Sequence, residues 1–404
     1  MAALRIIQNL GPEMGMDLNL KMNELVKFTS EPDDFPKDFK RFYRNFELLG
    51  TPIGDEKFCT EFIAKKVTKK LKHTLEAIGQ LEDAQVFHYM VRLTSSMCKV
   101  VHLLRAVPPK YCKQALIDFD DAIKEHVSLG LGICFTDQAW TQFCLPSRHG
   151  GAGLRRAQDH SAGAYLASVI SAASHDGWDP STAVGWHEAV ADFCALSGTV
   201  PPSQHDPPVE KQRDFSKLVD CKCRDDLIAG FASSPRDQAR LRSVGAAGSS
   251  SWLQVIPSFK LRLTFDPREY RILIRFWLGL NLGLPSPAFC PGLTCRMRMD
   301  DLGYHALTCQ TGGGLGVRHN ALREAFIHFC KLAGITGVKR EVRGLIPGTN
   351  ERPADVLLPP ASSCLAIPSF SSKPACLDFA VTHAQQPSVI QSASKVTAAA
   401  ADRY

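Results

Sequence analysis

The last quarter of the chain holds a closely spaced set of potential metal ligands, and this set limits how that part can fold. Four residues separate Cys290 from Cys295, nine separate Cys295 from His305, and three separate His305 from Cys309. Two close cysteines and a close His/Cys pair can supply the three sulfurs and one nitrogen of a tetrahedral zinc site. The spacing fits no common zinc-finger pattern well, so buried thiols beside a surface histidine remain the alternative.

Carboxylates follow this set in the sequence, next to short apolar runs. Glu324 lies on a helix expected over 319–332, Asp355 directly precedes the apolar run Val356–Leu358, and Asp378 lies within a second such run. Aspartates that project from neighbouring strands can converge on one Mg²⁺ ion, which activates water for phosphodiester cleavage. The alternative is that Asp355 and Asp378 only cap the ends of two strands.

A lysine usually completes a site of this kind by orienting water or stabilising the developing negative charge. The residue two positions after Asp378 is Ala380, so no lysine stands at the expected place. Lys395, on a helix expected after the second strand, is the main candidate, and Lys373 is a weaker one. The chain has neither a P-loop nor a Gly-x-Ser-x-Gly elbow, so the sequence supports neither of those chemistries.

The sequence between residues 55 and 130 predicts three consecutive amphipathic helices. Apolar residues recur at helical spacing over 62–78, 83–107 and 112–128, and the short links between these stretches predict a helical bundle. A row of lysines can bind nucleic acid without reading its sequence, or it can be the solvated face of an ordinary helix. The lysines on the first helix are Lys65, Lys66, Lys69, Lys70 and Lys72.

The middle of the chain is expected to be mostly helical. The Ala-rich stretch 157–173 and the stretch 217–243 predict helices, and residues 174–216 are rich in Ser, Asp, Pro and Gly, which predicts a linker. Basic and apolar residues are interleaved over 252–282. With 404 residues, of which 45% are hydrophobic, the chain can form two or three domains with cores of their own.

Charge and cysteine content narrow the cellular setting. Lys and Arg outnumber Asp and Glu by 47 to 41, a balance that permits nucleic-acid binding without arguing for it. No run approaches the roughly 20 apolar residues that a membrane-spanning helix needs. The apolar run within the first ten residues is too short to be the core of a secretory signal. With 14 scattered cysteines, these features predict an intracellular protein, nuclear or cytoplasmic, that is not secreted and has reduced thiols.

Four segments in order, GYHALTC, RHNALREAF, RPADVLLP and CLDFAVT, resemble the C-terminal part of non-LTR retrotransposon polyproteins. In these proteins a restriction-enzyme-like endonuclease follows a reverse transcriptase. GPEMGMDLNLKMNEL and LLGTPIG look like the last palm segments of a reverse transcriptase, and LPSRHGGAGLRRAQDHSAGAYLAS looks like the connector after the polymerase thumb. The resemblance covers nearly the whole chain, although each motif is short.

The resemblance implies a fold class and a domain order. The expected fold is α+β, mainly helical in the N-terminal and middle regions, with a small, incomplete α/β restriction-endonuclease-like domain at the end. The implied segments are a residual palm segment (1–54), a thumb-like basic helical bundle (55–130), a mostly helical connector with a flexible linker near 174–216 (131–282), a Cys/His zinc-knuckle-like segment (283–317) and a truncated endonuclease domain (318–404).

The resemblance also implies an activity, the metal-assisted hydrolysis of one DNA strand. Asp355 and Asp378 would hold Mg²⁺, Glu324 would assist, and a lysine, for which Lys395 is the main candidate, would stabilise charge. The Cys/His set would bind Zn²⁺.

Contacts with DNA or RNA would come from the lysine-bearing helix and from Arg318 and His319. Because no Tyr/Phe-x-Asp-Asp motif occurs, polymerase activity is not expected.

The chain departs from the family pattern in three places. It begins downstream of where the polymerase aspartates would stand, and it ends at Tyr404, within the helix expected after the second catalytic strand. Tyr304 stands where many relatives have a histidine, so either the metal set uses His305 or the ligation differs. These departures favour a second hypothesis, a non-catalytic, zinc-stabilised nucleic-acid-binding remnant. A helical scaffold with no nucleic-acid role is the third.

Overall fold

The computed structural model describes residue 10 and residues 12–14, 24–27, 40–200, 211–292, 294–309, 311, 314–360 and 374–402. Within these residues the chain is mostly helical with a few small β-sheets, which confirms the α+β class in its coarse form. None of the described helices is long and apolar enough to cross a membrane. The chain divides into a first unit, Met1–Ala229 with Ser250–Arg271, and a second unit, Gly230–Ser249 with Ile272–Tyr404.

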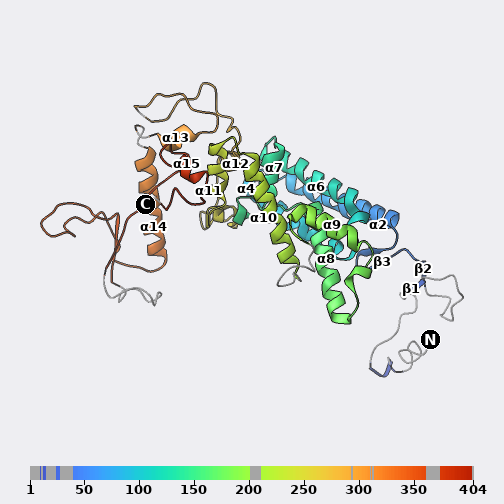
Figure 1. The fold of residues 1–404 in the computed structure, drawn as a ribbon. Helices are drawn as coiled ribbons and strands as arrows, with labels where there is room; N and C mark the ends of the chain where they lie inside the picture. The colour runs from blue at the N-terminus through green and yellow to red at the C-terminus, as the bar shows by residue number, and fades with distance from the viewer. Residues whose placement is uncertain are drawn as a thin grey trace. The chain divides into compact units, whose positions relative to one another are not determined.

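The first unit is organised around one long helix, α6 (Pro109–Leu131), which contacts α2, α3, α4, α8 and α9 (Figure 1). Its buried side chains include Leu116, Phe119 and Ile123. The other helical elements of this unit are η1 (Pro12–Met14), α2 (Glu56–Phe62), the π-helical η3 (Ile63–Thr68), α3 (Lys69–Gly79), α4 (Ala84–Thr94), η4 (Met97–Lys99), α5 (Val101–Ala106), α7 (Asp137–Cys144), η5 (Ser147–His149), α8 (Ala157–Asp176), η6 (Pro180–Thr182), α9 (Trp186–Ser197), α10 (Gln212–Gly230) and η8 (Ser251–Gln254).

Local sequence signals fix where several of these helices begin. Asp55 accepts a hydrogen bond from the backbone N–H of Phe58 (2.8 Å) and so caps α2, and Asp83 accepts from two backbone N–H groups at the start of α4. Pro109 occupies the first turn of α6, where its missing N–H would have no helical partner in any case. The apolar spacing and these caps together account for the helices expected over 62–78 and 112–128.

The single helix expected over 83–107 is divided in the structure. Helix α4 ends at Thr94 and α5 begins only at Val101. The hydroxyl of Thr94 donates to the carbonyl of Met90 (2.8 Å), and that of Ser96 donates to the carbonyl of Arg92 (2.9 Å). Hydroxyls that bond back to helix carbonyls compete with the helical ladder, so this end of α4 yields to a turn.

The flexible linker expected near 174–216 is wrong for Trp186–Ser197, which forms helix α9. Trp186, Ala189 and Phe193 are buried in a core that α8 and α10 also line. The ring of Phe193 lies 4.9 Å from that of Phe215, centroid to centroid. These apolar residues recur at helical spacing, and their burial outweighs the turn-rich composition around them. Residues 201–210 of the expected linker lie outside the described residues.

The N-terminus of α8 is capped by a side chain from another helix. Arg156, at the N-cap position, makes no side-chain capping bond. Asp120 of α6, which is 3% exposed, instead accepts hydrogen bonds from the backbone N–H groups of Ala157 (2.8 Å) and Gln158 (3.0 Å). Burial raises the pKa of Asp120 to about 7, against the opposing effect of these two N–H groups. One carboxyl group therefore joins α6 to α8.

Two small sheets precede the helices of the first unit. Strand β1 (Glu24–Lys27) pairs in parallel with β2 (Lys40–Tyr43), and β3 (Phe46–Leu48) pairs antiparallel with β4 (Thr51–Ile53). Both residues of the turn Leu49–Gly50 have positive φ, as two-residue hairpin turns require. The segment Phe46–Ile53 thus forms a hairpin.

The second unit contains a three-stranded antiparallel sheet with strand order β5-β6-β7. Helix α14 packs on this sheet, because its Ile327 and Cys330 are buried together with Val356 and Leu358 of β6. Helix α15 packs on α11 through small apolar side chains. The elements are α11 (Pro235–Val244), α12 (Pro267–Leu278, whose first residues belong to the first unit), α13 (Tyr304–Thr308), α14 (Gly314–Leu332), β5 (Lys339–Arg340), β6 (Val356–Leu358), β7 (Ala375–Leu377) and α15 (Ile390–Ala393).

Candidate metal centre and carboxylate site

Cys290 and Cys295 lie on a loop that a short antiparallel bridge closes. Phe289 and Arg298 form the bridge, and the backbone N–H of Cys290 donates to the carbonyl of Met297 (2.8 Å). Closing the loop at its base brings the two cysteines to the same side. The sequence anticipated two neighbouring thiols here, and the bridge explains how a spacing of four residues achieves it.

His305 lies on the one-turn helix α13, and Cys309 is the residue that caps its C-terminus, with its backbone N–H bonded to the carbonyl of His305 (2.8 Å). Four positions apart on a helix is one turn, so the two side chains leave the same face. The helix is held by Asp300, whose carboxylate accepts from the backbone N–H groups of Tyr304 (3.1 Å) and His305 (2.7 Å). Gly303, at φ 71°, provides the left-handed turn before it.

The four ligand atoms of this Cys/His cluster (Cys290, Cys295, His305 and Cys309) all lie within 4.8 Å of one another. The Sγ of Cys295 is 3.2 Å from Nε2 of His305. A tetrahedral zinc ion, with bonds of ~2.3 Å to sulfur and ~2.0 Å to nitrogen, separates its ligand atoms by roughly 3.5–3.8 Å. The cluster could therefore hold a metal ion such as zinc with little movement.

The thiol of Cys309 is also shifted toward the form that binds metal. A hydrogen bond with the Thr311 hydroxyl (3.6 Å) lowers the pKa of Cys309 to about 6, and the thiols of Cys295 and Cys290 add to this effect. The thiolate is the form of cysteine that ligates a metal. The donor set and its acidity thus suit a soft, tetrahedral ion.

Tyr304 is a core residue and not a ligand. Its side chain is buried, and its ring packs against those of Phe276 (5.7 Å between centroids) and His383 (6.0 Å). The adjacent His305 faces the cysteines. His305, and not Tyr304, is therefore the side chain that lies with the three cysteines in a group that could hold a metal ion.

The second candidate site lies where β6 begins and β7 ends. Val356 pairs with Leu377, so the antiparallel register places Asp355 opposite Asp378, one step beyond the last strand pair. On the other side, the backbone N–H of Glu341 donates to the carbonyl of Asp355 (2.9 Å). Directly opposed side chains of an antiparallel pair lie on one face with Cβ atoms ~5 Å apart. The sheet therefore brings the two predicted aspartates together as a pair.

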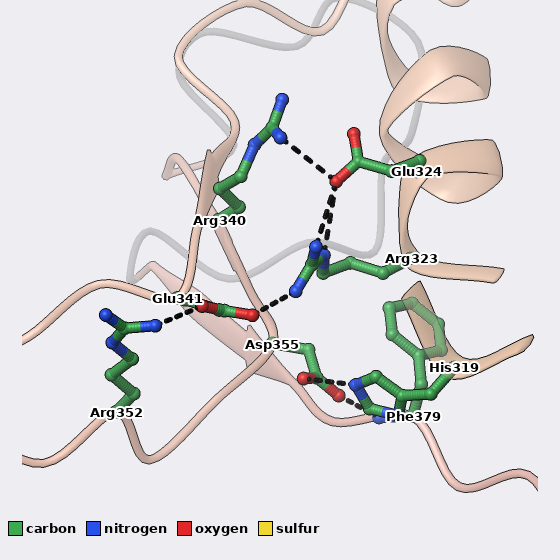
Figure 2. Close-up of polar contacts among 8 residues, drawn as sticks. All are labelled: His319, Arg323, Glu324, Arg340, Glu341, Arg352, Asp355 and Phe379. Atoms are coloured by element: carbon green, nitrogen blue, oxygen red, sulfur yellow. Dashed lines mark hydrogen bonds and ion pairs between the residues drawn. The ribbon is translucent and has the colours of Figure 1, made fainter. Parts of the chain in front are cut away.

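Two neighbours orient Asp355. Nε2 of His319, on α14, lies 2.8 Å from its Oδ1, and the backbone N–H of Phe379 donates to its Oδ2 at 2.7 Å (Figure 2). The Phe379 ring packs on Phe326 of α14, 5.3 Å between centroids, which fixes that N–H. His319, predicted to contact nucleic acid, thus bonds to a carboxylate within the fold.

The aspartate pair (Asp355 and Asp378) titrates as one unit. A hydrogen bond with Asp355 raises the pKa of Asp378, and burial and the negative charge of Asp355 act in the same direction. Burial opposes ionisation of Asp355 as well, but the N–H of Phe379 and the hydrogen bonds with Asp378 and His319 lower its pKa overall. Two carboxylates this close repel each other, and a cation between them would remove that repulsion.

A network of arginines and glutamates lies beside the aspartate pair, and its ion pairs join these residues to one another and not to the aspartates. Arg323 of α14, with a side chain only 8% exposed, pairs with Glu324 (3.1 Å) and with Glu341 (Figure 2). Arg340 also pairs with Glu324 (3.2 Å), and Arg352 pairs with Glu341. Glu324 was expected to assist the aspartates, but its carboxylate is directed to two arginines.

Sequence reasoning missed two members of this network. Arg323 stands at helical spacing from the buried Ile327 and Cys330, so a charge on the apolar face of α14 was a readable signal. Glu341 follows a two-residue strand, and its place beside Asp355 depends on strand register, for which the sequence holds no signal.

The remaining predicted site residues do not meet the aspartate pair. Arg318 donates to the carbonyls of Leu307 (2.6 Å) and Gly314 (3.2 Å), so its guanidinium links α13 to α14. Lys395 is exposed and follows Ser394, whose carbonyl accepts from Arg242 of α11 (2.9 Å). Lys373 lies outside the described residues.

The lysines predicted to bind nucleic acid are in the first unit. Lys65, Lys69, Lys70 and Lys72 are all exposed along η3 and α3, and the side chain of Lys66 lies outside the described residues. Their exposure is compatible with either of the two interpretations that the sequence allowed.

Comparison of the chain with models of known protein families and with curated protein sequences gave no match. The functional interpretation therefore depends on the chain's own geometry. Two arrangements carry chemical meaning: a Cys₃His cluster that could hold a metal ion, and a pair of aspartates in which the hydrogen bond with Asp355 raises the pKa of Asp378. Both lie in the second unit. In the sequence, the residues of the Cys/His cluster precede α14 and the two aspartates follow it.

Proposed function

We propose that the second unit is a metal-dependent endonuclease domain that hydrolyses one strand of DNA, of the kind found in non-LTR retrotransposon proteins. The observation that carries the proposal is the aspartate pair, in which two carboxyl groups from adjacent strands meet at the end of a sheet. A closely spaced carboxylate pair is a ready site for a divalent cation, because the cation removes the repulsion between the charges.

The order of elements around the pair supports this proposal. A helix, α14, precedes an antiparallel meander, and the two aspartates stand before the middle strand and after the third strand. This order is the one implied by the restriction-endonuclease resemblance. The apolar face of α14 rests on β6, so the helix holds His319 against Asp355.

The chain's own residues would divide the work as follows. Asp355 and Asp378 would hold Mg²⁺, an ion that, when bound, supplies a Lewis acid able to lower the pKa of a water molecule. His319 and the N–H of Phe379 fix the orientation of Asp355. Arg323 neutralises Glu324 and Glu341, which limits the negative charge that an approaching phosphodiester meets.

The Cys/His cluster would bind zinc in a structural role. Its donor set is complete with four protein ligands, which leaves no open position for a substrate, and such sites stabilise folds. The lysine-bearing surface of η3 and α3 would bind the phosphates of DNA or RNA.

A plasmid-nicking assay with Mg²⁺ tests the nuclease. The wild-type chain is compared with the double variant Asp355→Ala/Asp378→Ala and with Asp402→Ala, which removes an exposed carboxylate of the same unit. We expect the wild type and Asp402→Ala to convert supercoiled to nicked circles, and the double variant to lose this conversion. Equal cutting by all three proteins would refute the role of the aspartate pair.

A second function has a specific observation in its favour. Among the described residues, no lysine contacts the aspartate pair, and Glu324 is bound to two arginines. These features suit a non-catalytic, zinc-stabilised protein that binds nucleic acid. Salt-dependent binding of DNA or RNA together with no nicking by the wild type, at any Mg²⁺ or Mn²⁺ concentration, would select this alternative.

A further inference from the structure

The first unit contains a small cavity with an unusual lining. Its volume is about 230 Å³, and it opens to solvent between α4, the loop that follows α7, and η8. Arginines supply its positive charge, and its other polar groups are a hydroxyl and an amide. The residues that line it are Arg92, Pro146, Ser147, Gly153, Arg155 and Gln254.

A buried carboxylate orders the arginines on one side of the cavity. Asp220 of α10, whose side chain is 2% exposed, accepts from Nε (3.2 Å) and Nη2 (2.5 Å) of Arg155. The same carboxylate accepts from Nη2 of Arg148 at 3.1 Å. Arg155 and Arg148 are 29% and 53% exposed, so each can still reach solvent. Two guanidinium groups share one negative charge, which leaves a net positive charge in fixed positions.

Arg92 completes the positive lining from the opposite side. One of its Nη atoms donates to the backbone carbonyl of Leu253 (2.9 Å), which holds the guanidinium in place without neutralising it. Among the described residues, no carboxylate lies within ion-pair distance of Arg92. A guanidinium that is oriented but unpaired is suited to binding an oxyanion.

The effect of this charge is visible at a neighbouring histidine. Burial, together with the positive charges of Arg224, Arg148 and Arg155, lowers the pKa of His149 to about 4. The imidazole is therefore neutral at physiological pH, and the local potential that disfavours its charged form favours an anion.

The loop is already rigid before any ligand binds. The backbone N–H of Gly153 donates to the carbonyl of Leu145, and that of Ala152 to the carbonyl of Phe143, both at 2.9 Å. Gly153 has φ +85°, and a Cβ there would lie 3.4 Å from Cδ of Arg92, so glycine lets the loop turn beside that arginine. Gln254 donates to the hydroxyl of Ser147. A preformed site loses little conformational entropy when it binds.

We propose that this arginine cavity binds one phosphate group of a nucleic-acid backbone, with Arg92 and Arg155 on its walls and Arg148 at its edge. The volume suits a phosphate group, and no aromatic side chain lines the cavity to stack a base. The recognised group is therefore the phosphate and not a nucleoside. The choice of nucleic acid as its source rests on the proposed function, and free phosphate is the other source of the same chemistry.

Salt-dependent binding of the full chain tests the proposal. Anisotropy of a fluorescent single strand and of its duplex is measured from about 50 to 300 mM salt for the wild type, Arg92→Gln and Arg148→Gln. Arg213→Gln is the matched control, because Arg213 lies in the same unit with a side chain 78% exposed. Arg148 is half exposed, so its variant should fold even if Arg92→Gln does not. Far-UV circular dichroism checks both.

We expect each cavity variant to lower the slope of log K against log salt by about 0.7–0.9, the value for one lost phosphate contact, and the control to leave it unchanged. Slopes equal to that of the control would overturn the proposal. If inorganic phosphate binds tightly but does not compete with nucleic acid, the cavity binds free phosphate, and the assignment to a nucleic-acid backbone is wrong. Failure of the proposed nuclease appears separately, as absence of nicking in a protein whose cavity variants still bind less well.

Discussion

Asp120→Asn tests how the first unit attaches α8 to α6. In the wild type, a buried carboxyl group accepts two backbone N–H groups at the start of α8. Asparagine has almost the same shape but cannot ionise, and it offers one acceptor oxygen where the carboxylate offers two. The variant thus removes both a titration and one hydrogen bond.

The titration has a calculable sign and size. Burial raises the pKa of Asp120 from 3.8 to about 7. Below pH 3.8 the group is protonated in the folded and the unfolded chain. Between pH 3.8 and about 7 only the folded chain keeps the proton, so this stabilising contribution is full at low pH and is lost as the pH rises through about 7. The whole window corresponds to at most about 4 kcal/mol, and the part between about pH 5 and 7.5 to about 2–3 kcal/mol.

Urea unfolding at about pH 5 and about pH 7.5, followed by circular dichroism, measures this contribution. Buried His88 and His160, whose pKa values are lowered to about 3, make the wild type more stable as the pH rises, so the informative quantity is the difference between variant and wild type. Asp121→Asn, at the exposed neighbouring position, is the control.

We expect the stability of the wild type relative to Asp120→Asn to fall by about 2–3 kcal/mol between about pH 5 and about pH 7.5, because only the wild type must ionise a buried carboxyl group. Asp121→Asn should follow the wild type at both values. A gap that is the same at both pH values, or that widens as the pH rises, would show that the two N–H groups outweigh burial and that the reasoning is wrong.

Three further predictions concern the second unit and the lysine surface. Cys309→Ser should abolish zinc retention, measured by a colorimetric chelator after gel filtration, whereas Cys376→Ser, at an exposed thiol, should retain one zinc per chain. Arg323→Leu removes the guanidinium that Glu324 and Glu341 share, while Arg340 and Arg352 stay as their other partners. It should therefore lower the free energy of unfolding in urea by only about 1–2 kcal/mol, and rescue by Arg323→Lys should be incomplete. Changing Lys65, Lys69, Lys70 and Lys72 to Ala should lower the slope of log K against log salt by about 3, and an unchanged slope would remove this surface from the nucleic-acid interface.

The helices of the first unit could be predicted where apolar spacing was regular. Lys69–Gly79 and Pro109–Leu131 follow directly from that spacing and from turn-forming residues at their ends. Two features did not follow from apolar spacing, one for a local and one for a tertiary reason. Thr94 and Ser96 stop α4 through hydroxyl bonds that compete with the helix, and Trp186–Ser197 is helical because its apolar side chains find a core.

The candidate site was predictable only in part. The sequence analysis selected the cysteines and both aspartates because residue type and spacing alone indicate which ions such side chains can bind. It could not establish that Asp355 faces Asp378, because strand register depends on pairing across a long connection. Arg318 was assigned to nucleic acid from its position in a motif, and its hydrogen bonds to Leu307 and Gly314 show a structural use.

The hydrogen bonds of Arg318 have a consequence for the two sites together. Its guanidinium holds the end of α13, which carries His305, and the next residue of α14 is His319, which contacts Asp355. The two metal-binding arrangements therefore rest on adjacent residues of one helix. Thermodynamic linkage makes any coupling between them reciprocal, so that a metal ion in the Cys/His cluster and a cation on the aspartates would change each other's affinity by the same factor.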